Sequence, residues 1–153
     1  MTDIDEAPAP VLPRELTEIS DAVRAVAAPP TPTLAAPHAL RLADPDADAE
    51  LMSEWMNHRI HRYLSAQLDG EYSRPFICSL RGTPFAYVEL YRAAKDSIAP
   101  RYDADRYDIG LHGTIASPLP GGPPGVRKRR LCFSWRTRDG QSTHGVYAVN
   151  RSR

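Results

Sequence analysis

The sequence predicts an α/β domain with a mostly antiparallel sheet, helices that precede the strands, and an incomplete C-terminal third. Two observations support this fold class. Apolar residues recur at helical spacings in the first part of the chain, and alternating strand-like runs follow them. The pattern then stops at residues 117–125, SPLPGGPPG, where four prolines and three glycines permit neither a helix nor a central strand.

The 153 residues are enough for one domain, which we expect to lie between two dissimilar extensions. Residues 1–38 are rich in Ala and Pro, and they predict a disordered extension that holds one helix at about 14–28. Residues 39–116 carry the regular apolar patterns and predict the folded domain. Residues 117–153 predict a divergent basic tail with one or two strands.

The predictions for the N-terminal half rest on apolar spacing and on caps. An apolar stripe that stops at Pro29 predicts the first helix, and the run Ala39–Ala43 predicts a strand. Asp46 or Asp48 can cap the helix that follows. Another helical stretch ends at Gly70, which suits a left-handed C-terminal cap. The three stripes are Leu16, Ile19, Val23 and Val26; Leu51, Met52, Trp55 and Met56; and Ile60, Leu64 and Leu68.

Five further apolar runs predict strands. The first two are separated by Arg81-Gly82-Thr83, a sequence that predicts the turn of a tight hairpin. An irregular loop follows this hairpin. The five runs are residues 76–80, 84–91, 107–115, 130–134 and 145–149.

Composition excludes several classes of protein. No apolar run approaches the roughly 20 residues of a membrane-spanning helix, and the acidic start MTDIDEAPAP does not resemble a signal peptide. Cys78 and Cys132 are isolated, which is typical of reduced thiols and not of a disulfide scaffold. We therefore expect a cytoplasmic protein with no membrane partner.

Charge is unevenly distributed along the chain, although it sums to zero. Residues 1–117 hold 11 basic and 18 acidic side chains, whereas residues 118–153 hold eight basic side chains and one acidic one, Asp139. The basic run Arg127–Arg130 could contact phosphate, either of a nucleic acid or of a pantetheine carrier. Trp135 is the one nearby residue for base stacking, which argues against nucleic acid as a partner.

Two motifs could bind metal, and both are incomplete. His58 and His61 are three residues apart and could share a helix face, but no third ligand has suitable spacing. Residues 102–105 are acidic but lack the glycine and the final glutamate of a calcium loop. The sequence therefore predicts no metal.

The candidate site lies on two of the predicted strands. Because side chains alternate along a strand, Tyr87, Glu89 and Tyr91 share one face. On the strand at 107–115, Asp108 and His112 share a face in the same way. If the strands are neighbours, these side chains line one surface. A histidine near carboxylates can act as a base, an acid or a substrate-orienting partner, and the alternative is a histidine with structural hydrogen bonds only.

Three segments, residues 37–57, 62–96 and 102–116, resemble the siderophore-biosynthesis branch of the GNAT acyltransferases. They are similar above all to the lysine N-acyltransferases of mycobactin assembly, and more distantly to the hydroxylysine acetyltransferase of aerobactin assembly. The motifs that carry the resemblance are Glu54-Trp55-Met56-Asn57, Glu89-Leu90-Tyr91 followed by Ala93-Ala94-Lys95-Asp96, and Gly110-Leu111-His112.

The resemblance implies transfer of an acyl group from a CoA or carrier-protein thioester to the ε-amine, or hydroxylated ε-amine, of a lysine-like acceptor. It implies that His112 contacts the acceptor, on the surface shared with Glu89, Tyr91 and Asp108. It also implies an acidic general base on a later strand, a role for which Asp139 is the remaining carboxylate. This chemistry needs a deprotonated amine, donors for the oxyanion, and backbone amides that hold the pyrophosphate.

Three departures from the family pattern bear on activity. A Trp-containing segment is missing after Asn57, and residues 134–138 replace an acidic stretch. The prolines of residues 117–126 remove backbone donors from the expected pyrophosphate loop, and no helix is predicted after it. These departures motivate the hypothesis of a truncated, internally deleted or frame-disrupted member. The alternative function is then a catalytically inactive binding protein, whose uncovered apolar strands favour self-association.

Overall fold

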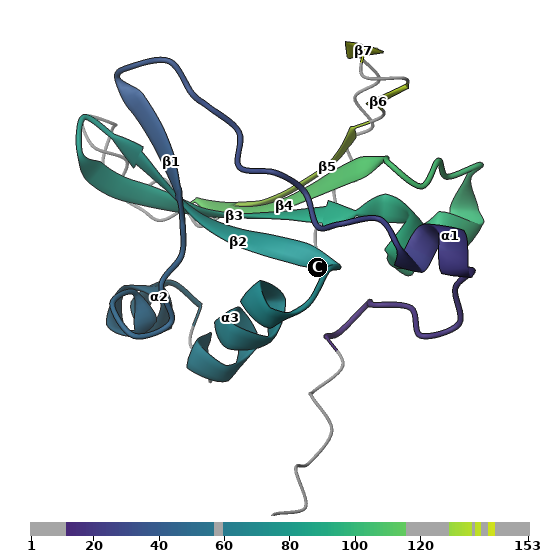
Figure 1. The fold of residues 1–153 in the computed structure, drawn as a ribbon. Helices are drawn as coiled ribbons and strands as arrows, with labels where there is room; N and C mark the ends of the chain where they lie inside the picture. Colours follow the sequence, from purple (N-terminus) through teal and green to yellow (C-terminus); the bar gives the residue numbers. More distant parts are fainter. Residues whose placement is uncertain (1–11, 57–59, 116–128, 136, 139–140, 143–153) are drawn as a thin grey trace, which may run out of the picture.

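The computed structural model describes residues 12–56, 60–115, 129–135, 137–138 and 141–142 (Figure 1). Its centre is an antiparallel sheet in the strand order β1-β2-β3-β4-β5. This sheet confirms the predicted fold class. The strands are β1 (His38–Leu42), β2 (Ser73–Leu80), β3 (Thr83–Arg92), β4 (Ile109–Ile115) and β5 (Arg129–Trp135), and a separate pair comprises β6 (Thr137–Arg138) and β7 (Gln141–Ser142).

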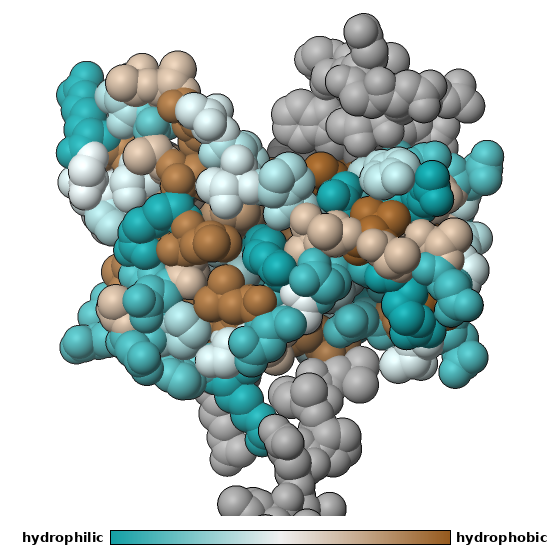
Figure 2. Space-filling view, in the orientation of Figure 1, coloured by the Kyte–Doolittle hydropathy of each residue, from teal (hydrophilic) through white to brown (hydrophobic). Residues whose placement is uncertain are grey.

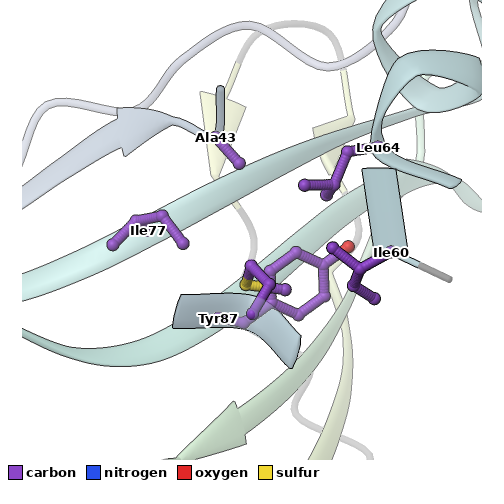
Figure 3. Close-up of a cluster of buried hydrophobic side chains, with 6 residues drawn as sticks. Ala43, Ile60, Leu64, Ile77 and Tyr87 are labelled. Atoms are coloured by element: carbon purple, nitrogen blue, oxygen red, sulfur yellow. The ribbon is translucent and has the colours of Figure 1, made fainter. Parts of the chain in front are cut away.

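Two helices, α2 (Ala49–Met56) and α3 (Ile60–Asp69), lie on one side of the sheet, and the connector that leads to β1 runs on the other side (Figure 1). Figure 3 shows side chains that converge from the helices and the strands. The buried cluster contains Ala43, Met52, Ile60, Leu64, Ile77 and Tyr87, with Trp55 packed against it. Its helical members belong to the predicted apolar stripes, so the stripes identified the faces that pack on the sheet.

The hairpin between β2 and β3 has the predicted turn. Leu80 pairs with Thr83, and both residues between them, Arg81 and Gly82, have positive φ angles of 50° and 80°. Positive φ at both central positions defines the type I′ turn, whose twist matches that of the paired strands. This hairpin brings β3 to the centre of the sheet, where β4 pairs with its other edge.

The N-terminal segment differs from the helix expected at about 14–28. The structure has only α1 (Asp21–Arg24), which Ser20 caps. Before it the chain turns at Arg14 and then runs beside residues 95–97, because backbone hydrogen bonds tie Leu16 N to Lys95 O at 2.9 Å and Ser97 N to Arg14 O at 2.8 Å. Apolar spacing is a weak prior, and these tertiary hydrogen bonds override it.

Two buried cations fasten this segment to the rest of the protein. The Lys95 ammonium donates to the carbonyls of Arg24, Val26 and Glu71 at 3.2, 2.6 and 3.0 Å. Arg92 Nε donates to the carbonyl of Ala27 at 2.7 Å.

Within the described ranges, no helix is long and apolar enough to cross a bilayer. Figure 2 shows apolar residues at the surface as separate patches among polar ones.

Candidate functional site

The candidate site is built on the pairing of β3 with β4. The register places Glu89 opposite His112, Tyr91 opposite Gly110, and Tyr87 opposite Thr114. Since directly paired residues project to the same side of a sheet, Tyr87, Glu89, Tyr91 and His112 share one face, as strand alternation predicts. The same face packs against α3, because Tyr87 belongs to the buried cluster beneath that helix.

Glu89 is the buried acid of this face, with only 6% of its surface exposed. Its Oε2 accepts a hydrogen bond from the Tyr63 hydroxyl at 3.0 Å. The Tyr87 hydroxyl lies 3.4 Å from the same oxygen and donates to Gln67 Oε1 at 2.9 Å. Burial raises the pKa of Glu89, and the hydrogen bonds from Tyr63 and Tyr87 offset only part of that rise. Glu89 is therefore more basic than an exposed carboxylate.

His112 is half-buried, and its described neighbours are aromatic and charged. The Tyr91 ring lies beside the imidazole, with 4.5 Å between the ring centroids and 30° between the planes. Gly110 makes room for this arrangement, because a Cβ at that position would overlap the Tyr91 ring. The strand glycine, which in a sequence often marks a bulge, here permits the close approach of an aromatic side chain.

Sequence reasoning missed Arg14, which contacts His112, and the pair Asp96 and Tyr72 that anchors it. Arg14 Nη1 lies 2.9 Å from His112 Nδ1 and also contacts Nε2, while Nη2 donates to Asp96 Oδ1 at 2.8 Å. The Tyr72 hydroxyl donates to the other oxygen of Asp96. Arg14 is separated from His112 by 98 positions in sequence. The sequence marks Arg14 in only one way: it is the first basic residue of the chain, and the next one is Arg24.

The other predicted site residues lie apart from this pair or outside the described residues. Asp108 precedes β4, is 1% exposed, and accepts a hydrogen bond from the backbone N–H of Asp105 at 3.0 Å. It therefore shapes the turn that leads into β4. Asp139, the candidate base, lies outside the described residues, as do His58 and the expected pyrophosphate loop at 117–126.

The described residues give no support for a metal centre. His61 Nε2 lies 2.8 Å from Asp46 Oδ1, an exposed pair. No group of three or more His, Cys, Asp or Glu side chains in the described part of the chain could hold a metal ion.

The arrangement can receive a cationic or amine-bearing ligand. Glu89, a buried carboxylate of raised pKa, lies directly opposite the half-exposed imidazole of His112 on the neighbouring strand. Such a pair can attract an ammonium group and accept a proton from it.

The comparison with protein families is more specific. The model of the acetyltransferase (GNAT) domain matches residues 44–129, more than half of the chain. The chain therefore belongs to the GNAT acetyltransferase family. The match contains Glu89 and His112, and it does not include Arg14.

The chain is similar to named acyltransferases of lysine and hydroxylysine. It is 63% identical over 130 residues to a lysine N-acyltransferase MbtK from Mycobacterium sp. (strain MCS), covering 76% of this chain and 53% of that protein. It is 46% identical to the Mycobacterium tuberculosis protein of the same name, covering 69% and 56%. An N(6)-hydroxylysine O-acetyltransferase from Escherichia coli is 34% identical, covering 47% and 27%. The chain spans about half the length of the two lysine N-acyltransferases.

Proposed function

We propose that this chain carries the acceptor side of an N-acyltransferase of mycobactin-type siderophore biosynthesis. The enzyme transfers an acyl group from a CoA or carrier-protein thioester to the ε-amino group of lysine or hydroxylysine. The observation that carries the proposal is the Glu89–His112 pair at the centre of the sheet, within a GNAT domain that is 63% identical to a lysine N-acyltransferase.

The chemistry gives each member of the pair a role. A lysine ε-amine has a pKa of about 10.4 in water, so at neutral pH it arrives as an ammonium and has to lose a proton before it attacks a thioester. The negative charge of ionised Glu89 attracts the ammonium, and the imidazole of His112 contacts and orients the amine. Tyr91 restricts the imidazole ring by packing beside it.

Two further parts of the proposal are a general base and a partner. Asp139, outside the described ranges, is proposed as the general base that completes deprotonation. An acyl carrier protein is the proposed macromolecular partner. We also propose a cytoplasmic location and self-association through the apolar side of the sheet.

The direct test is acylation of L-lysine by the purified chain. The chain is incubated with L-lysine and a series of acyl-CoA donors, and acyl-lysine is quantified by mass spectrometry. We expect acyl-lysine from the wild type and a loss of at least about a hundredfold in rate for His112→Ala. His38→Ala, at the exposed start of β1, is the matched control and is expected to keep the wild-type rate.

The alternative, a catalytically inactive binding protein, predicts a different result. In that case no donor gives acyl-lysine, although the folded chain still binds an acyl carrier protein in a salt-sensitive manner. Absence of turnover with every donor, in a preparation that unfolds cooperatively, would refute the enzymatic proposal.

A further inference from the structure

Arg14 reaches the candidate site from the N-terminal segment, outside the part of the chain that matches the GNAT model. Its guanidinium contacts both the His112 ring and the Asp96 carboxylate, and its Cζ lies 5.4 Å from the centroid of the Tyr91 ring. It therefore joins three side chains that come from separate parts of the chain, and one of these is the proposed acceptor-binding histidine.

Asp96 fixes the guanidinium in place. Its carboxylate is fully buried and accepts hydrogen bonds from the backbone N–H of Ile98 at 2.8 Å and from the Tyr72 hydroxyl. Burial by itself lowers the pKa of Arg14, but the Asp96 carboxylate together with Tyr91 and Tyr72 outweighs that effect, so the pKa lies above its ordinary value. The guanidinium is thus a permanent cation with one side committed to Asp96 and the other side facing His112.

The backbone at Arg14 is held in an unfavourable conformation. Its φ angle is 90°, in the left-handed region that residues other than glycine rarely adopt. Backbone hydrogen bonds on both sides impose it: Glu15 N donates to Leu12 O at 3.0 Å, and Ser97 N donates to Arg14 O at 2.8 Å. Such conformations persist where the surroundings determine them, and they cluster at functional sites.

The contact with Arg14 constrains the orientation of the imidazole. Arg14 Nη1 contacts both nitrogens of the His112 ring, so it lies against the imidazole and limits how far the ring can turn. Tyr91 packs beside the same ring. The orientation of the imidazole is therefore held by these two side chains before an acceptor arrives.

We propose that Arg14 is a positioning residue that holds the His112 imidazole in one orientation. The proposal rests on the proposed role of His112 in binding the amine. It assigns a function to the segment before the GNAT match, because Arg14, anchored to Asp96, contacts the imidazole from that segment.

The test is proton NMR of the His112 ring at constant pH in the full chain, with the signals assigned through His112→Ala. Arg14→Met removes the donor and keeps much of the apolar stem. Arg14→Lys keeps the charge without the planar fork that spans two partners. The matched control is Arg41→Met, since Arg41 pairs with another buried carboxylate, Asp48, on a strand remote from β4.

In the wild type we expect His112 ring proton signals displaced from those of an exposed histidine, because the imidazole is held beside the Tyr91 ring. Arg14→Met should move these signals toward the values of an exposed histidine, Arg14→Lys should give intermediate values, and Arg41→Met should leave them unchanged. Unchanged shifts in Arg14→Met, or an equal change in Arg41→Met, would overturn the proposal. If Arg14→Met does not fold, the shifts of Arg14→Lys decide in the same way.

A kinetic arm separates this inference from the proposed function. With L-lysine and acyl-CoA, Arg14→Met should lower kcat by about tenfold to a hundredfold while the KM for acyl-CoA stays the same. If the wild type gives no product but the ring shifts still depend on Arg14, the acylation proposal fails and the positioning role stands. A wild-type rate in Arg14→Met, with altered ring shifts, would show that the reaction does not need Arg14 and would overturn the inference.

Discussion

Gly110 and Tyr91 form the tightest packing relationship in the candidate site. They lie opposite each other on β4 and β3, and the Tyr91 ring occupies the space that a Cβ of residue 110 would need. The phenol is buried at 2% exposure, so it cannot swing into solvent without losing its packing against Tyr72 and Leu12. The position of His112 therefore depends on the absence of a side chain two residues earlier.

Gly110→Ala should destabilise the protein through this overlap. Overpacking of a buried position typically costs about 1–3 kcal/mol in the free energy of unfolding. Urea unfolding of Gly110→Ala, Tyr91→Ala and the double variant measures the coupling between the two positions. We expect the alanine at 110 to cost less when Tyr91 is absent, and equal costs in both backgrounds would contradict the contact.

Glu89 gives stability a pH dependence whose sign is fixed by burial. The ordinary pKa of the side chain is 4.5, and burial raises it in the folded protein. Between these two values the folded state keeps a proton that the unfolded chain has released. Relative to a glutamine at this position, Glu89 favours folding below about pH 4.5 and loses that advantage as pH rises through the raised pKa.

We therefore expect the free energy of unfolding of the wild type, minus that of Glu89→Gln, to fall as pH increases from about 4 and then to level off. Chemical unfolding at a series of pH values measures this difference. Glu50→Gln, at the exposed start of α2, controls for the substitution itself. A difference that rises with pH would contradict the assignment of a raised pKa to Glu89.

At the scale of elements, α3 links the core to the site. Leu64 is fully buried in the cluster with Ile77, while Tyr63 and Gln67 of the same helix hydrogen bond to Glu89 and Tyr87. The helix can place these polar groups because its apolar stripe fixes which side faces the sheet. The stripe was readable from the sequence, but the polar contacts beside it were not.

Leu64→Ala should remove a large contact beneath the site. Truncation of a buried leucine typically costs about 2–5 kcal/mol of stability. Leu68→Ala, on the same helix but half-exposed, is the control and should cost clearly less. Denaturant unfolding measures both, and equal losses would contradict the burial of Leu64 against the sheet.

At the scale of the whole molecule, the sequence predicted the features that local patterns determine, but not those that depend on contacts between residues far apart in the chain. The hairpin at Arg81-Gly82 and the shared face of Glu89 and His112 follow from turn chemistry and from the period of two along a strand. The partnership of Arg14 with Asp96 does not follow from any local rule, because 82 positions separate the two residues. Backbone hydrogen bonds to residues 95 and 97, equally distant in sequence, replaced the start of the expected helix.

The attachment of the N-terminal segment is testable through Lys95. Lys95→Met removes the donor for three carbonyls and keeps an unbranched side chain, so we expect a loss of about 1–3 kcal/mol from unsatisfied buried groups. Hydrogen exchange at the amide of Leu16, which donates to Lys95 O, should become faster than exchange within β3. Equal protection of Leu16 in both proteins would contradict the attachment.

The central claim is that the Glu89–His112 pair receives the amine of a lysine-like acceptor. Its most direct test is a titration of the His112 ring proton signals with L-lysine and, in parallel, with norleucine, which lacks the ε-amine. Lysine should shift these signals in a saturable way, norleucine should not, and Glu89→Gln should weaken the response to lysine. Equal responses to both amino acids, or none to lysine in the folded chain, would contradict the claim.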